Sequence, residues 1–271
     1  MIKSSMHNHT NLCDGKNTPR EMAEAAIALG FTDFGFSGHS TNNKFFSQWG
    51  LKDEIKYIEA INYLKKEYKD RINIYLGIEN DYHGRTINRD SLDYLITSVH
   101  GFVSGDKNEY YSIDDTVEEL ILGIDKVYKG DSMKMIEGYF HNLCKAVELD
   151  SPDIIGHFDL PTKLNKGNVI FNEKSNEYLR LAKEAIRHLV DKSIFEVNTG
   201  AIYRGYREFP YPREELLYYI LKENGRVTIS GDAHNTEGIN YWFDEGVMLL
   251  RDIGYKEIYE YKNSHFKRAF L

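Results

Sequence analysis

Two histidines stand one residue apart near the start of the chain, in the stretch "MHNHTNLCDG", and an aspartate follows five positions after the second. In an extended segment, residues i and i+2 point to the same side, so His7 and His9 can contact the same ion. Imidazole nitrogens and carboxylate oxygens are ligands of zinc, manganese and iron, and Asp14 is close enough in sequence to join them. A lone His-x-His pair is weak evidence, because most such pairs are ordinary surface or core residues.

Similar side chains follow the other segments that read as strands. They are His39 in "DFGFSGHS", Glu79 in "INIYLGIEND", His100 in "YLITSVHG", His157 in "DIIGHFD", and Asp232 and His234 in "TISGDAHN". If the strands are parallel, their carboxyl ends open on one face and these groups converge in space. Packing alone gives no reason for polar side chains at equivalent points of successive strands. The sequence therefore predicts a metal site.

The segments that must position these groups alternate between short β-type runs and longer amphipathic stretches. We expect strands over 2–7, 33–37, 72–78, 94–99, 153–156, 194–198 and 227–231, with a short terminal strand at 257–261. One helix is expected over 19–29, capped by Thr18 and Glu21 and ended by Gly30, and another over 213–224. This alternation predicts an α/β fold with a parallel sheet, and seven or eight units favour a (β/α) barrel over an open sheet.

Residues 106–150 fit this alternation less well. A helix is expected to begin at 112–115 and another to cover 133–147, so two helices separate neighbouring strands. We interpret this region as a helical insertion in one crossover of a single domain spanning 1–271, because no linker, repeat or low-complexity run divides the chain.

The composition suits a soluble enzyme. The chain has 271 residues, and 34 basic against 42 acidic residues give a net charge of −8, which argues against nucleic acid or anionic membrane as a partner. Neither a signal-peptide-like run nor 18 consecutive apolar residues occur. Two cysteines, Cys13 and Cys144, are too few for a disulfide framework, so we expect a reducing cytoplasm.

Cys13 is not expected to be a ligand. His141 and His188 on helical segments, and His265 in a helix-like tail, are expected to be solvated or capping residues.

Across essentially its whole length the sequence resembles the PHP (polymerase and histidinol phosphatase) family of metal-dependent phosphoesterases. The motifs that carry the likeness are "HNH", "GHS", "GIEND", "SVHG", "DIIGHFDL" and "GDAH". Within that family it looks most like the stand-alone histidinol-phosphatases, which have a segment similar to "EVNTGAIYRGYREFPYP". The resemblance implies a distorted (β/α)7 TIM-like barrel with a trinuclear metal centre.

The resemblance also implies how the ligands divide among three divalent ions. The first ion would be held by His7, His9, Glu79 and Asp232; the second by Glu79 as a bridge with His100 and His157; and the third by Asp14, His39 and His234. Zinc, manganese or iron are the expected metals, with magnesium as a further option, because an aspartate at position 14 is a hard ligand.

Two cations bridged by a carboxylate suit phosphoryl transfer, in which a hydroxide shared between them would attack phosphorus in line with the leaving alkoxide. The expected catalytic residues are Glu79, Asp232, His234 and Arg204. Arg204 is the expected phosphate contact, since a guanidinium can engage two oxygens. Further candidates for substrate contact are Arg207, Lys163, Asn198, Asp81, Tyr82 and His83.

The leading hypothesis is hydrolysis of L-histidinol phosphate to L-histidinol and phosphate, a late step of histidine synthesis. Another small phosphomonoester, a phosphotyrosine protein or a nucleotide would keep the chemistry and change the substrate. A metal-loaded barrel without turnover, acting as a structural or regulatory subunit, is a different class. The sequence does not identify the native metal or the oligomeric state.

Overall fold

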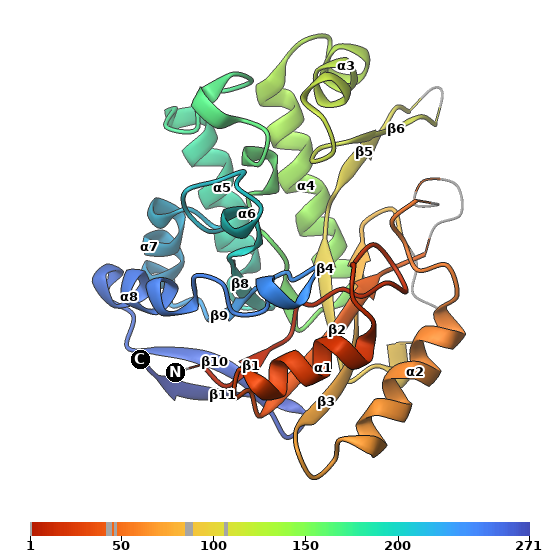
Figure 1. The fold of residues 1–271 in the computed structure, drawn as a ribbon. Coiled ribbons are helices and arrows are strands. Elements are labelled where there is room, and N and C mark those ends of the chain that lie inside the picture. The colour runs from red at the N-terminus through yellow and green to blue at the C-terminus, as the bar shows by residue number, and fades with distance from the viewer. Residues whose placement is uncertain (1, 42–44, 46–47, 85–88, 106–107) are drawn as a thin grey trace.

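The computed structural model describes residues 2–41, 45, 48–84, 89–105 and 108–271. Within this part of the chain, parallel strands form a seven-stranded sheet in the order β1-β2-β3-β4-β7-β8-β9, which curls into a nearly closed barrel (Figure 1). Its strands are β1 (Ser4–Ser5), β2 (Asp33–His39), β3 (Asn73–Asp81), β4 (Tyr94–Ser98), β7 (Ile154–Ile155), β8 (Ile194–Asn198) and β9 (Val227–Ser230). The expected fold class, an α/β barrel of seven parallel strands, is confirmed.

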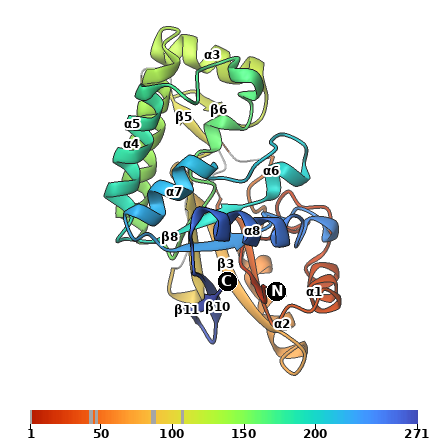
Figure 2. The same cartoon turned by 90° about the vertical axis from the view of Figure 1, so that its left-hand side faces the viewer.

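Helices surround the sheet and cover it from outside (Figures 1 and 2). They are α1 (Pro19–Ala28), α2 (Glu54–Glu67), α3 (Val117–Tyr128), α4 (Ser132–Asp150), α5 (Asn176–Leu189), α6 (Gly200–Tyr203), α7 (Glu214–Lys222) and α8 (Phe243–Ile253). The predicted start of α1 is confirmed, because Thr18 and Glu21 form a capping box, and Gly30 follows the helix with a left-handed φ of 79°. No helix in the described part of the chain combines the length and apolarity needed to cross a membrane.

The barrel closes at the carboxyl ends of its strands. The chain beyond β1 crosses to the segment after β9, where the amide of His9 donates to the carbonyl of Ala233 (2.8 Å) and the amide of Ala233 donates to the carbonyl of His7 (3.2 Å). The strand β1 pairs with β2 at Ser4 and Ser5, and farther along the amide of Ser37 on β2 donates to the carbonyl of Asn8 (2.9 Å). The closing segment is the one that carries the His-x-His pair.

A hairpin of β10 (Glu257–Lys262) and β11 (His265–Phe270) covers the opposite end. The amide of Lys3 donates to the carboxylate of Glu260, and the amide of Tyr261 donates to Ser4 Oγ (3.2 Å), so the hairpin holds the start of β1. The expected terminal strand is present, but it pairs antiparallel with β11 outside the barrel sheet. The expectation of a helix-like tail at His265 is wrong, because residues 265–270 form a strand that pairs with β10 along its whole length.

The segment between β4 and β7 contains a hairpin of β5 (Gly101–Val103) and β6 (Tyr110–Ser112), followed by α3 and α4 (Figure 2). The predicted helix start at 112–115 is wrong, since Ser112 ends a strand and its hydroxyl accepts from the amides of Asp114 and Asp115. The helix begins at Val117, after Thr116 accepts from the amide of Glu119 (3.1 Å) as N-cap.

Tyr94 fills the barrel interior and links its strands. Its ring lies against Gly35 and Gly77 so closely that a Cβ at either glycine would come within 2.4 Å of a ring or hydroxyl atom. Its hydroxyl is within hydrogen-bonding reach of the carbonyl oxygens of Met6 and Phe36, the latter at 2.9 Å. The single hydroxyl proton of this side chain on β4 can therefore be donated to a backbone carbonyl next to β1 or to one on β2.

Replacing Tyr94 with phenylalanine is expected to lower the free energy of unfolding by about 1–3 kcal/mol, because buried carbonyl groups lose a donor. The matched control is Tyr178→Phe, since the Tyr178 hydroxyl is also buried but has no hydrogen-bond partner among the described residues. Urea unfolding of both variants measures the difference, and equal losses would contradict the role given to Tyr94.

Candidate metal centre

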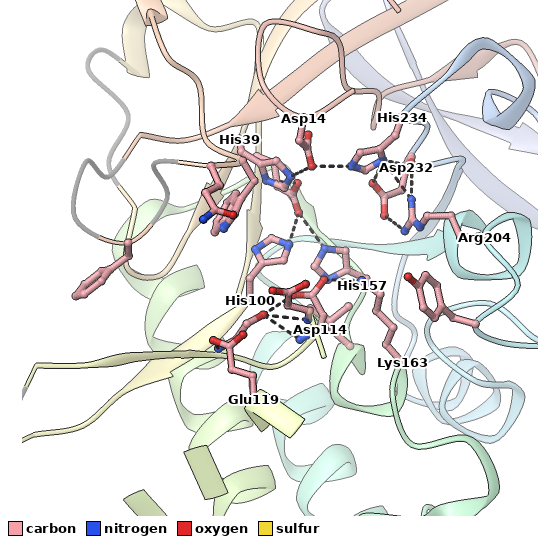
Figure 3. Close-up of a pocket in the computed structure, with 18 of the residues that line it drawn as sticks. Asp14, His39, His100, Asp114, Glu119, His157, Lys163, Arg204, Asp232 and His234 are labelled. Carbon is pink, nitrogen blue, oxygen red and sulfur yellow. Dashed lines mark hydrogen bonds and ion pairs between the residues drawn. The ribbon is translucent and has the colours of Figure 1, made fainter. Parts of the chain in front are cut away.

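The side chains expected as ligands meet at the carboxyl ends of the barrel strands, and Figure 3 labels six of them, Asp14, His39, His100, His157, Asp232 and His234. They come from the ends of strands or the segments just beyond them: His7, His9 and Asp14 after β1, His39 on β2, Glu79 on β3, His100 after β4, His157 after β7, and Asp232 and His234 after β9. A cavity of about 550 Å³ opens above them and is lined by all of these except His7 and His9, which are fully buried.

The carboxylate of Glu79 is central to the cluster and almost completely buried. Its Oε2 lies 3.1 Å from Nε2 of His7, 3.4 Å from Nε2 of His9 and 3.0 Å from Nδ1 of His39. Its Oε1 lies 2.9 Å from Nε2 of His157 and 3.4 Å from Nε2 of His100. Each oxygen thus faces a separate group of imidazoles, as expected of a carboxylate that bridges two cations.

Several of these atoms are buried without a hydrogen bond. His7 Nε2, His9 Nε2, His39 Nδ1 and Glu79 Oε2 have no partner in hydrogen-bond geometry among the described residues, although they approach one another. Leaving buried polar atoms unsatisfied costs free energy, whereas a cation coordinated by their lone pairs would satisfy them together. The donor set therefore fits divalent metal ions.

The distances suggest a grouping close to the predicted one. Ligand atoms of His7, His9 and Glu79 lie within 4.8 Å of one another, as do those of His39, Glu79 and His100. A third group with the same spacing consists of His9, Asp14, His39 and His234. His9 and His39 each belong to two groups, so the division of the ligands among three ions stays a prediction.

Asp232 and Arg204 form one side of the centre. Asp232 Oδ1 lies 3.3 Å from His9 Nε2 and 3.6 Å from His7 Nε2. Arg204 donates from Nη2 to Asp232 Oδ2 and from Nη1 to the Asp232 carbonyl, both at 2.9 Å. The arginine also lines the cavity, so its guanidinium is held in place beside the cluster.

The charges of the cluster are strongly coupled. Burial disfavours the Glu79 carboxylate, but His7, His39 and His100 hold its pKa well below the ordinary value. Burial together with His234 and His39 lowers the pKa of His9 to about 3, which keeps this imidazole neutral. Burial also opposes a charged His39, yet Asp14 and Glu79 raise its pKa well above the usual value. Positive charge is favoured at the centre, and protons must leave those imidazoles that bind a cation.

The predicted substrate contacts separate into two sets. Lys163 and Arg204 line the cavity, and Lys163 Nζ pairs with Asp114 Oδ2 at 2.8 Å. Arg207 does not line it, since its buried guanidinium donates to both carboxylate oxygens of Glu173 (2.8 and 2.7 Å). Arg207 therefore lies outside the cavity that Lys163 and Arg204 line.

The remaining candidates are not among the residues that line the cavity. Asp81 is buried and accepts from the amides of His100 and His83, both at 2.7 Å. Asn198 is buried and accepts from the amide of Gly200 (2.9 Å). The His83 ring lies 6.0 Å from that of Tyr110, which does line the cavity. Substrate contact by Asp81, Asn198, Tyr82 or His83 stays a prediction.

Sequence reasoning missed several residues of the site. Glu196 is buried 2.7 Å from His7 Nδ1, and a charged residue in the apolar strand "IFEVN" was the signal that could have revealed it. The lining of the cavity also includes Asp114, Asp115 and Glu119 together with Trp49 and Tyr206. These residues come from loops and from the segment between β4 and β7, where no periodic pattern identifies inward-facing positions.

Two histidines that were expected to be solvated or capping residues on helical segments do lie on helices. His141 is on α4, and His188 on α5 pairs with Glu148 at the surface (2.6 Å). Cys13 is buried with Sγ 3.7 Å from His9 Nδ1, and burial together with Asp14 raises the pKa of its thiol.

Residues 5–200 match the PHP domain, and the chain belongs to this family of proteins. Among its relatives, the "Probable histidinol-phosphatase" of Deinococcus radiodurans is 28% identical over 262 residues, covering 92% of both chains. The "Histidinol-phosphatase" of Bacillus subtilis is 27% identical over 271 residues, covering 90% of this chain and 98% of the relative.

A solved structure has the same fold over nearly the whole chain. It is the crystal structure of histidinol phosphate phosphatase from Lactococcus lactis subsp. lactis Il1403, complexed with zinc, L-histidinol and phosphate. It superposes with a TM-score of 0.73 at 21% identity and covers 98% of this chain and 99% of that one.

The central position of Glu79 predicts the effect of Glu79→Gln. A neutral amide offers one oxygen ligand where the carboxylate offers two, so we expect the variant to lose at least one bound ion per chain after dialysis. Metal analysis by mass spectrometry measures the stoichiometry. Glu173→Gln is the control, because Glu173 is equally buried but pairs with Arg207. Wild-type metal content in Glu79→Gln would contradict a bridging role.

Proposed function

We propose that this chain is a metal-dependent phosphatase that hydrolyses L-histidinol phosphate to L-histidinol and phosphate. The observation that carries the proposal is the convergence of buried, unsatisfied imidazole and carboxylate atoms below a cavity that also contains a guanidinium. The histidinol-phosphatases of Deinococcus radiodurans and Bacillus subtilis, which align over nine-tenths of the chain, support this substrate.

Three divalent cations, of zinc, manganese or iron with magnesium as a further option, are the proposed cofactors. The residues that would hold them are His7, His9, Asp14, His39, Glu79, His100, His157, Asp232 and His234. When bound, such ions activate water as a nucleophile and offset charge on the phosphoryl oxygens. The cluster lies at the carboxyl ends of the strands, where barrel enzymes build their active sites.

Arg204 is the proposed contact for the phosphate oxygens. Its hydrogen bonds to Asp232 hold the guanidinium at the edge of the cavity and leave other N–H groups available to an anion. Lys163 adds a second cation on the same lining, although its pairing with Asp114 reduces the charge it offers. These two groups orient the phosphate toward the cluster.

Other lining residues favour a substrate that also carries positive charge. Asp115 and Glu119 line the cavity, as do Trp49 and Tyr206, so an ammonium or imidazolium group would find carboxylates and aromatic faces. Additional phosphates of a nucleotide would be repelled by the same carboxylates. L-Histidinol phosphate combines a phosphate with an amine and an imidazole, and therefore matches both the cationic and the acidic residues of the lining.

The proposed substrate predicts a clear ranking in steady-state kinetics. L-Histidinol phosphate should exceed p-nitrophenyl phosphate, a phosphotyrosine peptide and a nucleoside monophosphate in kcat/KM by at least tenfold, which corresponds to about 1.4 kcal/mol of transition-state stabilisation. Equal or higher kcat/KM for another substrate would refute the assignment of histidinol phosphate while leaving a phosphatase in place. No turnover of any phosphomonoester by metal-loaded protein would favour the structural or regulatory alternative.

Arg204→Ala should raise KM for L-histidinol phosphate about tenfold or more, because charge-assisted hydrogen bonds to the phosphate are lost. Arg180→Ala is the control, since Arg180 is exposed on α5 and pairs only with Glu184 among the contacts described. Initial-rate measurements at saturating metal give both constants. An unchanged KM in Arg204→Ala would remove this residue from the phosphate site.

A further inference from the structure

We infer that Glu196 is a positioning residue, which fixes the tautomer of His7 and the backbone at His157 so that both imidazoles present a nitrogen to the metal centre. The inference rests on the metal centre of the proposed function and makes no use of the identity of the substrate. Glu196 lies on β8, is fully buried, and does not line the cavity, so it acts through other residues.

The contact with His7 determines where the ring proton lies. Glu196 Oε1 is 2.7 Å from His7 Nδ1, and both side chains are fully buried. A carboxylate only accepts hydrogen bonds, so Nδ1 must carry the proton that it receives. In the neutral imidazole, which is the form that binds a cation, the other ring nitrogen, Nε2, then keeps a lone pair, and this atom lies 3.1 Å from Glu79 Oε2 without a hydrogen bond. A histidine held in this way is oriented for metal binding.

The second carboxylate oxygen binds the neighbouring strand. Glu196 Oε2 accepts from the backbone amide of His157 and from Asn198 Nδ2, both at 2.9 Å. Asn198 can only donate here, because its Oδ1 accepts from the amide of Gly200 (2.9 Å). Both donors at Oε2 are therefore fixed by their surroundings. One side chain couples the histidine after β1 to the histidine after β7, which face different oxygens of Glu79.

The same arrangement occurs on the other side of the centre. Asp81 Oδ2 lies 3.1 Å from His100 Nδ1 and accepts from the His100 amide (2.7 Å), while His100 Nε2 points to Glu79 Oε1 (3.4 Å). Two strands that are not adjacent, β3 and β8, thus each place a buried carboxylate next to Nδ1 of an imidazole. This repetition favours a function in orienting ligands and argues against a contact that is only structural.

The fixed donors make Glu196→Gln an informative variant. The amide oxygen of the glutamine must face the His157 amide and Asn198, because its NH2 group would meet two donors there. The NH2 group is then directed at His7 and can donate only to an Nδ1 without a proton. This moves the proton of His7 to Nε2 and removes the lone pair that would bind an ion. The substitution changes few atoms and reverses the tautomer.

The test compares Zn²⁺ binding by the wild type and by Glu196→Gln. Both proteins are loaded with Zn²⁺ and then dialysed against chelators of graded strength. Changes to residues that orient metal ligands typically cost 10–100-fold in metal affinity, so we expect a loss of tenfold or more in the variant. Glu173→Gln is the control for the general cost of removing a buried carboxylate; it should lose stability and keep wild-type Zn²⁺ affinity. Equal Zn²⁺ affinity in Glu196→Gln and the wild type would overturn the inference.

Long-range ¹H–¹⁵N spectra of the Zn²⁺-loaded wild type provide a second measurement, made with Glu196 in place. The inference requires the ring proton of His7 on Nδ1, identified by comparison with His7→Gln, and a proton on Nε2 would overturn it. Failure of the proposed function can be told apart from failure of this inference. A protein that prefers another phosphomonoester leaves the inference intact, whereas a wild type without Zn²⁺ at this centre would end both.

Discussion

A single buried carboxylate surrounded by imidazole nitrogens is the constraint on which the site depends. Glu79 faces His7, His9 and His39 with one oxygen and His100 and His157 with the other, and water has almost no access to it. Burying a charge costs several kcal/mol unless it is compensated. Asp14, Asp232 and Glu196 add further negative charge nearby, and Arg204 offsets only part of it. Positive charge on the imidazoles of His7, His39 and His100 stabilises the Glu79 carboxylate, and divalent cations bound by these groups would take over that role when the protons leave.

The barrel meets this constraint through its topology. Each strand brings one or two polar groups to the same end, and the chain after β1 closes the barrel by pairing with Ala233 next to His7 and His9. Tyr94 supports the same strands from the interior, where Gly35 and Gly77 leave room for its ring. The rigidity of the sheet therefore extends to the ligands, while the segment between β4 and β7 supplies the acidic wall of the cavity.

The sequence was informative where local chemistry repeats and less so where contacts are long-range. The alternation of strands and helices predicted the barrel, and ligand types at successive strand ends predicted the cluster, since parallel strands bring their carboxyl ends together. The cap at Thr18 was also predicted from local sequence. The tail at His265 was misread because a short polar strand on an edge has little period of its own. The roles of Asp81 and Glu196 depend on partners up to 189 residues away, which spacing along the chain does not reveal.

The most direct test of a shared cation centre is an anomalous-difference map from crystals of the protein purified without chelators and grown with Zn²⁺. The account predicts peaks between the Glu79 carboxylate and the imidazole nitrogens of His7, His9, His39 and His100, with metal–nitrogen distances of about 2.0–2.1 Å. A map with no peak among these side chains, or with zinc only at surface histidines such as His188, would contradict it.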